Sequence, residues 1–138
     1  MPIIYVNDNF GRWISDFRKT VERCSRHRTR GAIARLLPPQ ASDYFVLKPR
    51  HSGFYLTPLE LLLRDLGVDR LILTGFATDI CVLHTAADAH MRHLDLTVVA
   101  DRVAAEYAAV NRFALREMAR SFGARVVQSA ELHVPRRR

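Results

Sequence analysis

RLILTGFATDICVLHTAADA, residues 70–89, is the stretch that decides the fold. Its first part, 71–74, is an apolar run bounded by charged residues and Gly75, which predicts a buried strand. A helical pattern follows, and Thr78 or Asp79 is expected to cap it by accepting hydrogen bonds from free backbone N–H groups. Cys81 then falls in the first helical turn, where the positive end of the helix dipole favours thiolate over thiol.

Strand and helix patterns alternate along the rest of the chain. Strands are expected at 2–6, 43–49, 94–100 and 124–128, and helices at 16–24, 58–66 and 108–122. This alternation predicts an α/β fold of three layers, with a parallel sheet between helices. Because no repeat, low-complexity segment or boundary interrupts the 138 residues, we expect a single domain over residues 1–138. The last of the three helices is expected to turn inward Val110, Phe113, Ala114, Met118 and Phe122.

Composition and charge narrow the classes of partner. The net charge of +7 comes largely from arginines within 23–35 and at 136–138. Such runs suit nucleic acid, but no basic stripe is interleaved with aromatic residues, so we favour a solvated arginine-rich surface. No run approaches the roughly 20 apolar residues that cross a bilayer, so no membrane association is expected. Two cysteines, Cys24 and Cys81, do not make a disulfide framework, which indicates a reducing cytoplasm.

The carboxyl ends of parallel strands form the ligand crevice of such folds. Lys48 ends one expected strand and Cys81 follows another, so both should lie at the same edge. A lysine ammonium near a cysteine favours the thiolate, and lysine can also pass a proton to a leaving group. Taken singly, the cysteine would be an ordinary core residue and the lysine a solvated one; together they favour a catalytic site.

These residues resemble a known family, the isochorismatase-like cysteine hydrolases, which include nicotinamidases and N-carbamoyl amidohydrolases. The resemblance covers about residues 3–132 and implies the Rossmann-like fold of that family. Its most specific part is the block G-x-x-T-x-x-C-V with a downstream A-x-D-A. The matching segments are YVND at 5–8, VLKPRHSGF at 46–54, LILTGFATDICVLHTAADA at 71–89, LTVVAD at 96–101 and FGARVV at 122–127.

The resemblance implies a role for each matched residue. The family's nucleophile corresponds to Cys81 and its active-site lysine to Lys48. A cis peptide bond is implied between Phe76 and Ala77, and the backbone N–H groups of Ala77 and Cys81 would form an oxyanion hole. The implied activity is cysteine-dependent hydrolysis of a small amide or related C–N bond through a thioester, with no cofactor.

One departure from the family concerns its general base. The family carries a catalytic aspartate at the end of its first strand, whereas the match here begins at what should be the second strand. We therefore expect an N-terminally incomplete domain with an empty central slot in the sheet, or a slot closed by direct pairing or by another chain. Asp8 is the candidate substitute carboxylate, and its alternative role is that of a turn residue. The alternative function is a truncated, catalytically impaired member that acts as a small-molecule or protein binding module.

Residues around the expected pocket indicate the kind of ligand. Their aromatic character suits a small flat or apolar acyl group, although Phe54 and Phe76 are equally typical of a core. We expect a small-molecule substrate and a homo-oligomer. No metal site is expected, because His51 is the single histidine in a suitable loop and His84, His90 and His93 fall on or just after the helix of Cys81. The expected substrate-binding residues are Asn9, Trp13, Phe54 and Phe76.

Overall fold

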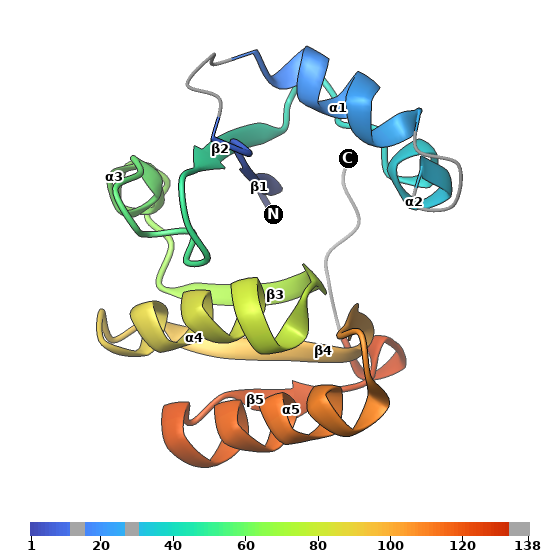
Figure 1. The fold of residues 1–138 in the computed structure, drawn as a ribbon. Coiled ribbons are helices and arrows are strands. Elements are labelled where there is room, and N and C mark those ends of the chain that lie inside the picture. Colours follow the sequence, from blue (N-terminus) through green and yellow to red (C-terminus); the bar gives the residue numbers. More distant parts are fainter. Residues whose placement is uncertain (12–15, 27–30, 133–138) are drawn as a thin grey trace.

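The computed structural model describes residues 1–11, 16–26 and 31–132, and it confirms an α/β fold with parallel strands (Figure 1). Trp13 and the arginine-rich tail at 136–138 lie outside the described residues. Within them, no helix is both long and apolar enough to cross a membrane. The elements are β1(Ile4–Asp8), α1(Phe17–Ser25), α2(Gly31–Leu36), β2(Tyr44–Lys48), α3(Leu59–Asp65), β3(Arg70–Phe76), the π-helix η1(Thr78–Val82), α4(Leu83–His90), β4(Asp95–Ala104), α5(Ala108–Phe122), β5(Arg125–Val127) and the 3-10 turn η2(Ser129–Glu131).

The strands form two separate parallel sheets. β1 pairs with β2 in a register that sets Asp8 opposite Lys48, and β3, β4 and β5 form the second sheet in that order. Among the described residues, no strand of one sheet pairs with a strand of the other, and Figure 1 shows β1 and β2 standing apart from β3. The break between the two sheets corresponds to the empty central slot that was expected in the sheet.

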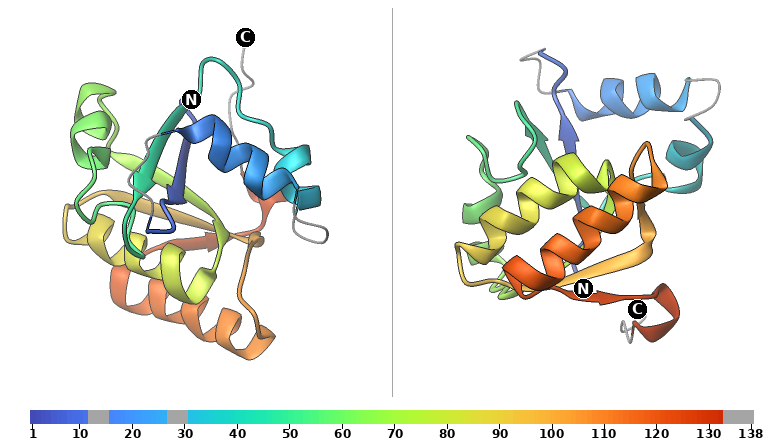
Figure 2. Two further views of the ribbon diagram at one scale, coloured as in Figure 1. Left: turned by 45° about the horizontal axis from the view of Figure 1, so that its top comes forward. Right: turned by 60° about the horizontal axis from the view of Figure 1, so that its bottom comes forward.

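Helices α4 and α5 lie side by side against one face of the β3–β4–β5 sheet (Figure 2). In α5, Ala114 and Met118 are completely buried, as expected from their spacing of one turn. Phe113 was expected to point inward but is 58% exposed. It lies about 100° around the helix from Ala114, beyond the narrow buried stripe.

The start of the helix that follows β3 differs from the expectation. Ala77 is the N-cap residue, and neither Thr78 nor Asp79 caps the helix with its side chain. The first turn is wound as a π-helix, in which Val82 N–H donates to Ala77 O at 3.1 Å. Thr78 is fully buried, so its hydroxyl is turned into the interior and away from the free N–H groups.

A single apolar cluster joins the two sheets. It takes Val46 from β2, Phe54 from the following loop and two leucines from α3, and it continues into the helices and β4 of the second sheet. Burial of this surface is therefore what unites the two parts. The buried members are Val46, Phe54, Leu59, Leu63, Val82, Ala86, Ala89, Leu96, Val98, Val103, Met118 and Ala124.

Arg92, just beyond α4, makes ion pairs and a ring contact at the surface of this junction. Its guanidinium donates to Glu60 at 2.7 Å and to Asp88 at 3.3 Å, and it lies over the ring of Phe54, 4.7 Å from the centroid. The hydrogen bond from Arg92 holds the pKa of the Glu60 carboxyl below its ordinary value of 4.5. Glu60 also accepts from Arg64 of its own helix. Arg92 therefore links Glu60 of α3 to Asp88 of α4.

Replacement of Met118 by alanine tests the core directly. Because the Met118 side chain is completely buried, Met118→Ala should lower the free energy of unfolding by about 2–5 kcal/mol. The matched control is Phe113→Ala on the same helix, where exposure should keep the change within about 0.5 kcal/mol. Urea denaturation followed by circular dichroism measures both. Equal losses would contradict the assigned inward face.

The ion pair between Arg92 and Glu60 should make the free energy of unfolding depend on pH. A carboxyl whose pKa is lowered in the folded state adds stability above its unfolded pKa and loses that contribution as the pH falls through the folded pKa. Glu60→Gln should therefore be less stable than the parent at neutral pH, and the difference should shrink below pH 4.5. The control, Glu106→Gln at an exposed position, should show no such trend. Thermal melts across the acidic range test this, and a constant difference would refute it.

Candidate active site

Asp8 and Lys48 meet because they are partners across two parallel strands. β1 extends to Asp8, beyond the strand end expected at residue 6. Partners in register direct their side chains to the same face of a sheet, and Lys48 Nζ forms an ion pair with Asp8 Oδ1. The Lys48 side chain is only 3% exposed, whereas that of Asp8 is 42% exposed. The ion pair is thus open to solvent on the carboxylate side.

The Lys48 ammonium has two further partners. Nζ donates to the carbonyl oxygen of Arg50 at 3.1 Å and to Cys81 Sγ at 3.3 Å. An ammonium has three N–H donors, so a carboxylate, a carbonyl and a sulfur together use all of them. The charged amine is therefore a direct hydrogen-bond donor to the sulfur.

Cys81 reaches this position from the other sheet. It lies in η1, directly after the carboxyl end of β3, and it is half-buried. The peptide bond between Phe76 and Ala77 is cis. Ala77 O accepts the N–H groups of both Ile80, at 3.2 Å, and Val82, at 3.1 Å, and this anchors the turn that carries the cysteine.

The loop after Lys48 is fixed against the helix that bears Cys81. Gly53 N–H donates to Thr85 Oγ1 at 2.9 Å. The rings of His51 and His84 are in contact, with centroids 5.2 Å apart, and His84 Nδ1 lies 2.7 Å from Ile80 O. The loop therefore contacts the helix at two residues that follow Cys81, and one of them, His84, in turn contacts the turn of the cysteine.

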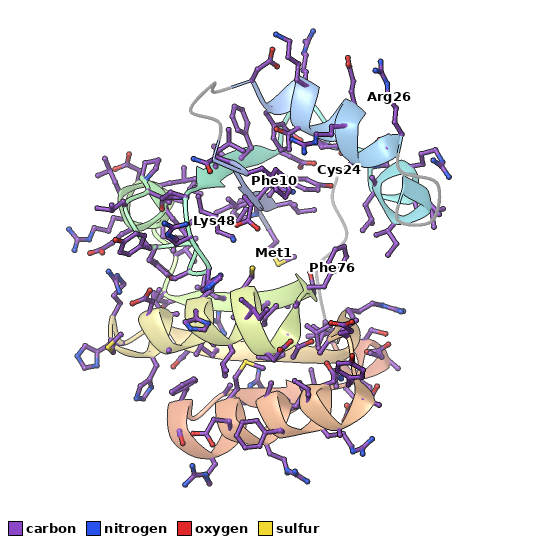
Figure 3. The ribbon with its side chains drawn as sticks, viewed as in Figure 1. Met1, Phe10, Cys24, Arg26, Lys48 and Phe76 are labelled. Atoms are coloured by element: carbon purple, nitrogen blue, oxygen red, sulfur yellow. The ribbon has the colours of Figure 1, made fainter. Side chains whose placement is uncertain are left out.

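Of the four expected substrate-binding residues, the three that the structure describes differ in their burial. Asn9 is held at the end of β1, since its N–H donates to Lys48 O at 2.9 Å and its Oδ1 accepts from Gly11 N–H at 2.9 Å. Phe76 lies at the end of β3 (Figure 3), and it is 59% exposed. Phe54 is 6% exposed and belongs to the core cluster. Trp13 lies outside the described residues.

Two contributors to the site were missed in the sequence. The Arg50 carbonyl is a backbone group, which residue types cannot reveal. Thr85 had a usable signal, because it stands one helical turn after Cys81 and so shares its side of the helix. Across residues 1–11, 16–26 and 31–132, no three His, Cys, Asp or Glu side chains are grouped as metal ligands.

Two surface hollows lie away from these groups. One, of about 370 Å³, lies between β2 and α3 and is lined by side chains that include Phe45 and Leu61. The other, of about 210 Å³, lies beside Phe54 and Arg92. Asp8, Lys48 and Cys81 line neither hollow, so we locate the site by its chemical groups rather than by the size of the hollows.

Comparison with known proteins identifies the family of this chain. The family model for the isochorismatase domain matches residues 1–131. The isochorismatase family protein YaaI of Bacillus subtilis is 44% identical over 85% of this chain, and the ureidoacrylate amidohydrolase RutB of Methylorubrum extorquens is 40% identical over 67%. The solved structure of N-carbamoylsarcosine amidase from Thermoplasma acidophilum superposes with a TM-score of 0.70 at 34% identity, over 97% of this chain and 76% of that one.

The lengths of these relatives differ from that of this chain. The matches span 64% of YaaI and 38% of RutB. The match of the family model nonetheless runs through every strand and helix described above, from β1 to η2. With its fold, its cysteine turn and its lysine in the matched region, the chain belongs to the isochorismatase family.

Proposed function

We propose that this protein is a cysteine-dependent hydrolase of a small amide or related C–N bond. The observation that carries the proposal is the position of Lys48 Nζ, between the Asp8 carboxylate and Cys81 Sγ, with 3.3 Å separating nitrogen from sulfur. A nucleophile, a charge partner that contacts it and an acceptor that orients this partner form a recurrent arrangement in acyl transfer. In this proposal, Asp8 replaces the carboxylate that the family carries on its first strand.

The first step is attack by sulfur on the amide carbonyl carbon. Lys48 passes one of its protons to Asp8 as it takes the proton of the Cys81 thiol, so that the ammonium is regenerated and the carboxyl becomes neutral. The thiolate forms a C–S bond while the carbonyl π electrons move to oxygen. The N–H groups of Ala77 and Cys81 would hold that oxyanion.

Collapse of this adduct breaks the C–N bond. The proton stored on Asp8 returns through Lys48 to the nitrogen, which leaves as ammonia or an amine, and the acyl group stays on Cys81 as a thioester. Water then attacks the thioester, gives a proton to the Asp8–Lys48 pair and releases the acid. The thiol recovers its proton from the same pair, so one amide and one water yield one acid and one amine.

The names of two relatives favour one substrate class. A ureidoacrylate amidohydrolase and an N-carbamoylsarcosine amidase both act on a carbamoylated nitrogen, as their names state. We therefore propose small N-carbamoyl or ureido compounds as the first substrates to test. Phe76 offers an exposed flat surface near the cysteine turn, which suits a small flat or apolar group.

We also propose that residues 1–138 form one domain that assembles as a homo-oligomer. Ile72 and Phe76 are 38% and 59% exposed on β3, and contact between copies would remove such apolar side chains from water. Molar mass from light scattering tests this part. A monomer at all concentrations would refute it without affecting the proposed chemistry.

The contact with Lys48 should make Cys81 the more reactive of the two cysteines. Both are half-buried, but Cys24 lies on α1 (Figure 3). With limiting iodoacetamide at neutral pH, Cys81 should be alkylated at least about tenfold faster than Cys24. Lys48→Met should remove this difference and leave Cys24 unchanged. Peptide mass spectrometry measures both sites in one sample, and equal slow labelling in the parent would contradict the proposed activation.

Turnover tests the reaction itself. On a panel of N-carbamoyl, ureido and primary aromatic amides, Cys81→Ala should reduce product formation by at least about a thousandfold, because the covalent step is lost. Asp8→Asn should reduce it by about a hundredfold, because the proton acceptor is lost. The control is Asp69→Asn, an exposed aspartate whose side chain is 90% accessible, which should keep the parent rate. Release of ammonia or amine measures all four proteins.

The outcomes distinguish the hydrolase from the binding module. Activity that persists in Cys81→Ala would refute the cysteine mechanism. A folded parent that turns over no member of the panel, yet is protected from thermal unfolding by one of them, would favour a small-molecule binding module. Full activity in Asp8→Asn would assign the role of the carboxylate elsewhere.

A further inference from the structure

The proposed reactive groups lie on opposite sides of a break in the strand order. Asp8 and Lys48 end the two strands of the β1–β2 sheet, whereas Cys81 follows β3 of the other sheet. In the described part of the chain, no ladder of backbone hydrogen bonds joins the two sheets. Strand register therefore fixes Asp8 relative to Lys48, but it does not fix Lys48 relative to Cys81.

One short path of hydrogen bonds does cross between the two sides. Lys48 Nζ donates to the carbonyl of Arg50 at 3.1 Å, and three residues later Gly53 N–H donates to Thr85 Oγ1 at 2.9 Å. Thr85 stands one helical turn beyond Cys81, so the two residues occupy the same side of one helical segment. The hydroxyl of Thr85 thus links the loop of the lysine to the helix of the cysteine.

The loop has little freedom at the point where Thr85 holds it. Gly53 is buried, and its carbonyl accepts the hydroxyl of Thr57 at 2.5 Å. A Cβ added at Gly53 would come within 3.1 Å of both Leu59 Cδ2 and Val6 Cγ1. With both of its backbone groups bonded and its surroundings filled, Gly53 transmits the position of Thr85 to the neighbouring loop.

We propose that Thr85 is a positioning residue that sets the contact between Lys48 and Cys81 by anchoring the loop at Gly53. The inference rests on the proposed function, in which that contact activates the cysteine. Without the Thr85 hydroxyl, Gly53 N–H loses its acceptor, and the loop that carries Arg50 O is free to shift. Lys48 would follow its acceptor and separate from the sulfur, while the fold kept its core.

The test is the rate of Cys81 alkylation as a function of pH. Thr85→Val keeps the shape of the side chain but removes the hydroxyl, and Thr85→Ser keeps the hydroxyl. We expect Thr85→Val to slow alkylation at neutral pH by about fivefold or more, and to leave the rate unchanged at high pH, where any thiol is ionised. Thr85→Ser should restore the parent profile.

Two controls separate positioning from general damage to the fold. Thr97→Val removes the hydroxyl of a buried residue of β4, which accepts a hydrogen bond from Arg125 of β5 at 3.2 Å, and it should leave the profile unchanged. The double variant Lys48→Met with Thr85→Val should be no slower than Lys48→Met alone, because a residue that acts through the lysine has no effect once the lysine is gone. If Thr85→Val does not fold, Thr85→Ala is measured in the same scheme.

The possible results are distinct. The proposal is supported if Thr85→Val slows the alkylation of Cys81, Thr85→Ser alkylates at the parent rate, and Thr85→Val has no further effect in the Lys48→Met background. A parent-like profile in Thr85→Val, with Lys48→Met slowed, overturns the role of Thr85 and leaves the proposed function standing. Slowing that persists in the double variant also overturns it. Parent-like alkylation in Lys48→Met overturns both proposals, since the lysine would then not activate the cysteine.

Discussion

The structure around the site depends on one buried cation. Lys48 is 3% exposed, and a charge removed from water is tolerated only when it is paired and hydrogen-bonded. Its three acceptors come from β1, from its own loop and from the turn after β3. Three segments distant in sequence must therefore converge on one nitrogen. The sulfur of Cys81 is part of that requirement, and is not simply a group that happens to lie near a lysine.

The apolar cluster and the hydrogen bonds contribute differently to the junction between the two sheets. Burial of residues such as Val46, Phe54 and Val82 holds the two sheets together, but apolar contacts tolerate small displacements. A distance of 3.3 Å between nitrogen and sulfur requires directional restraints. Those restraints come from the loop that follows β2, which is bonded to the helix of the cysteine rather than to a neighbouring strand.

The sequence predicted much of this arrangement. Alternating strand and helix patterns were sufficient for the parallel α/β fold, and the bounds of α5 are those expected from its pattern and Gly123. The convergence of Lys48 and Cys81 followed from the rule that parallel strands end at one edge. The sequence indicates Asp8 only as a substitute carboxylate or a turn residue, because the apolar run ends before Asn7 and predicts a strand that stops short of Asp8. Polar residues can still complete a strand where it opens onto a site.

Other differences arise because a sequence pattern does not specify how deeply a side chain is buried. An aromatic residue in a loop, such as Phe54, is compatible with both a pocket and a core, and only packing beneath Arg92 decides between them. Phe113 fits the apolar face that the helical pattern predicts, yet the buried residues of α5 are Ala114 and Met118. Residue type favours Thr78 or Asp79 as the cap of this helix, whereas Ala77 is the N-cap of η1 and tertiary packing buries the Thr78 side chain.

In the proposed reaction, charge balance gives Asp8 a role that follows from its partial exposure. With Asp8 and Lys48 charged and Cys81 a thiol, the group is neutral, and loss of the thiol proton to water would leave one uncompensated negative charge beside a buried amine. Transfer of that proton to Asp8 through Lys48 keeps the group neutral, so no net charge is left beside the buried amine. Because the Asp8 side chain is 42% exposed, the same carboxyl can also exchange protons with incoming water. A more deeply buried carboxylate would orient the lysine equally well, but it would have no direct route to the water that is proposed to hydrolyse the thioester.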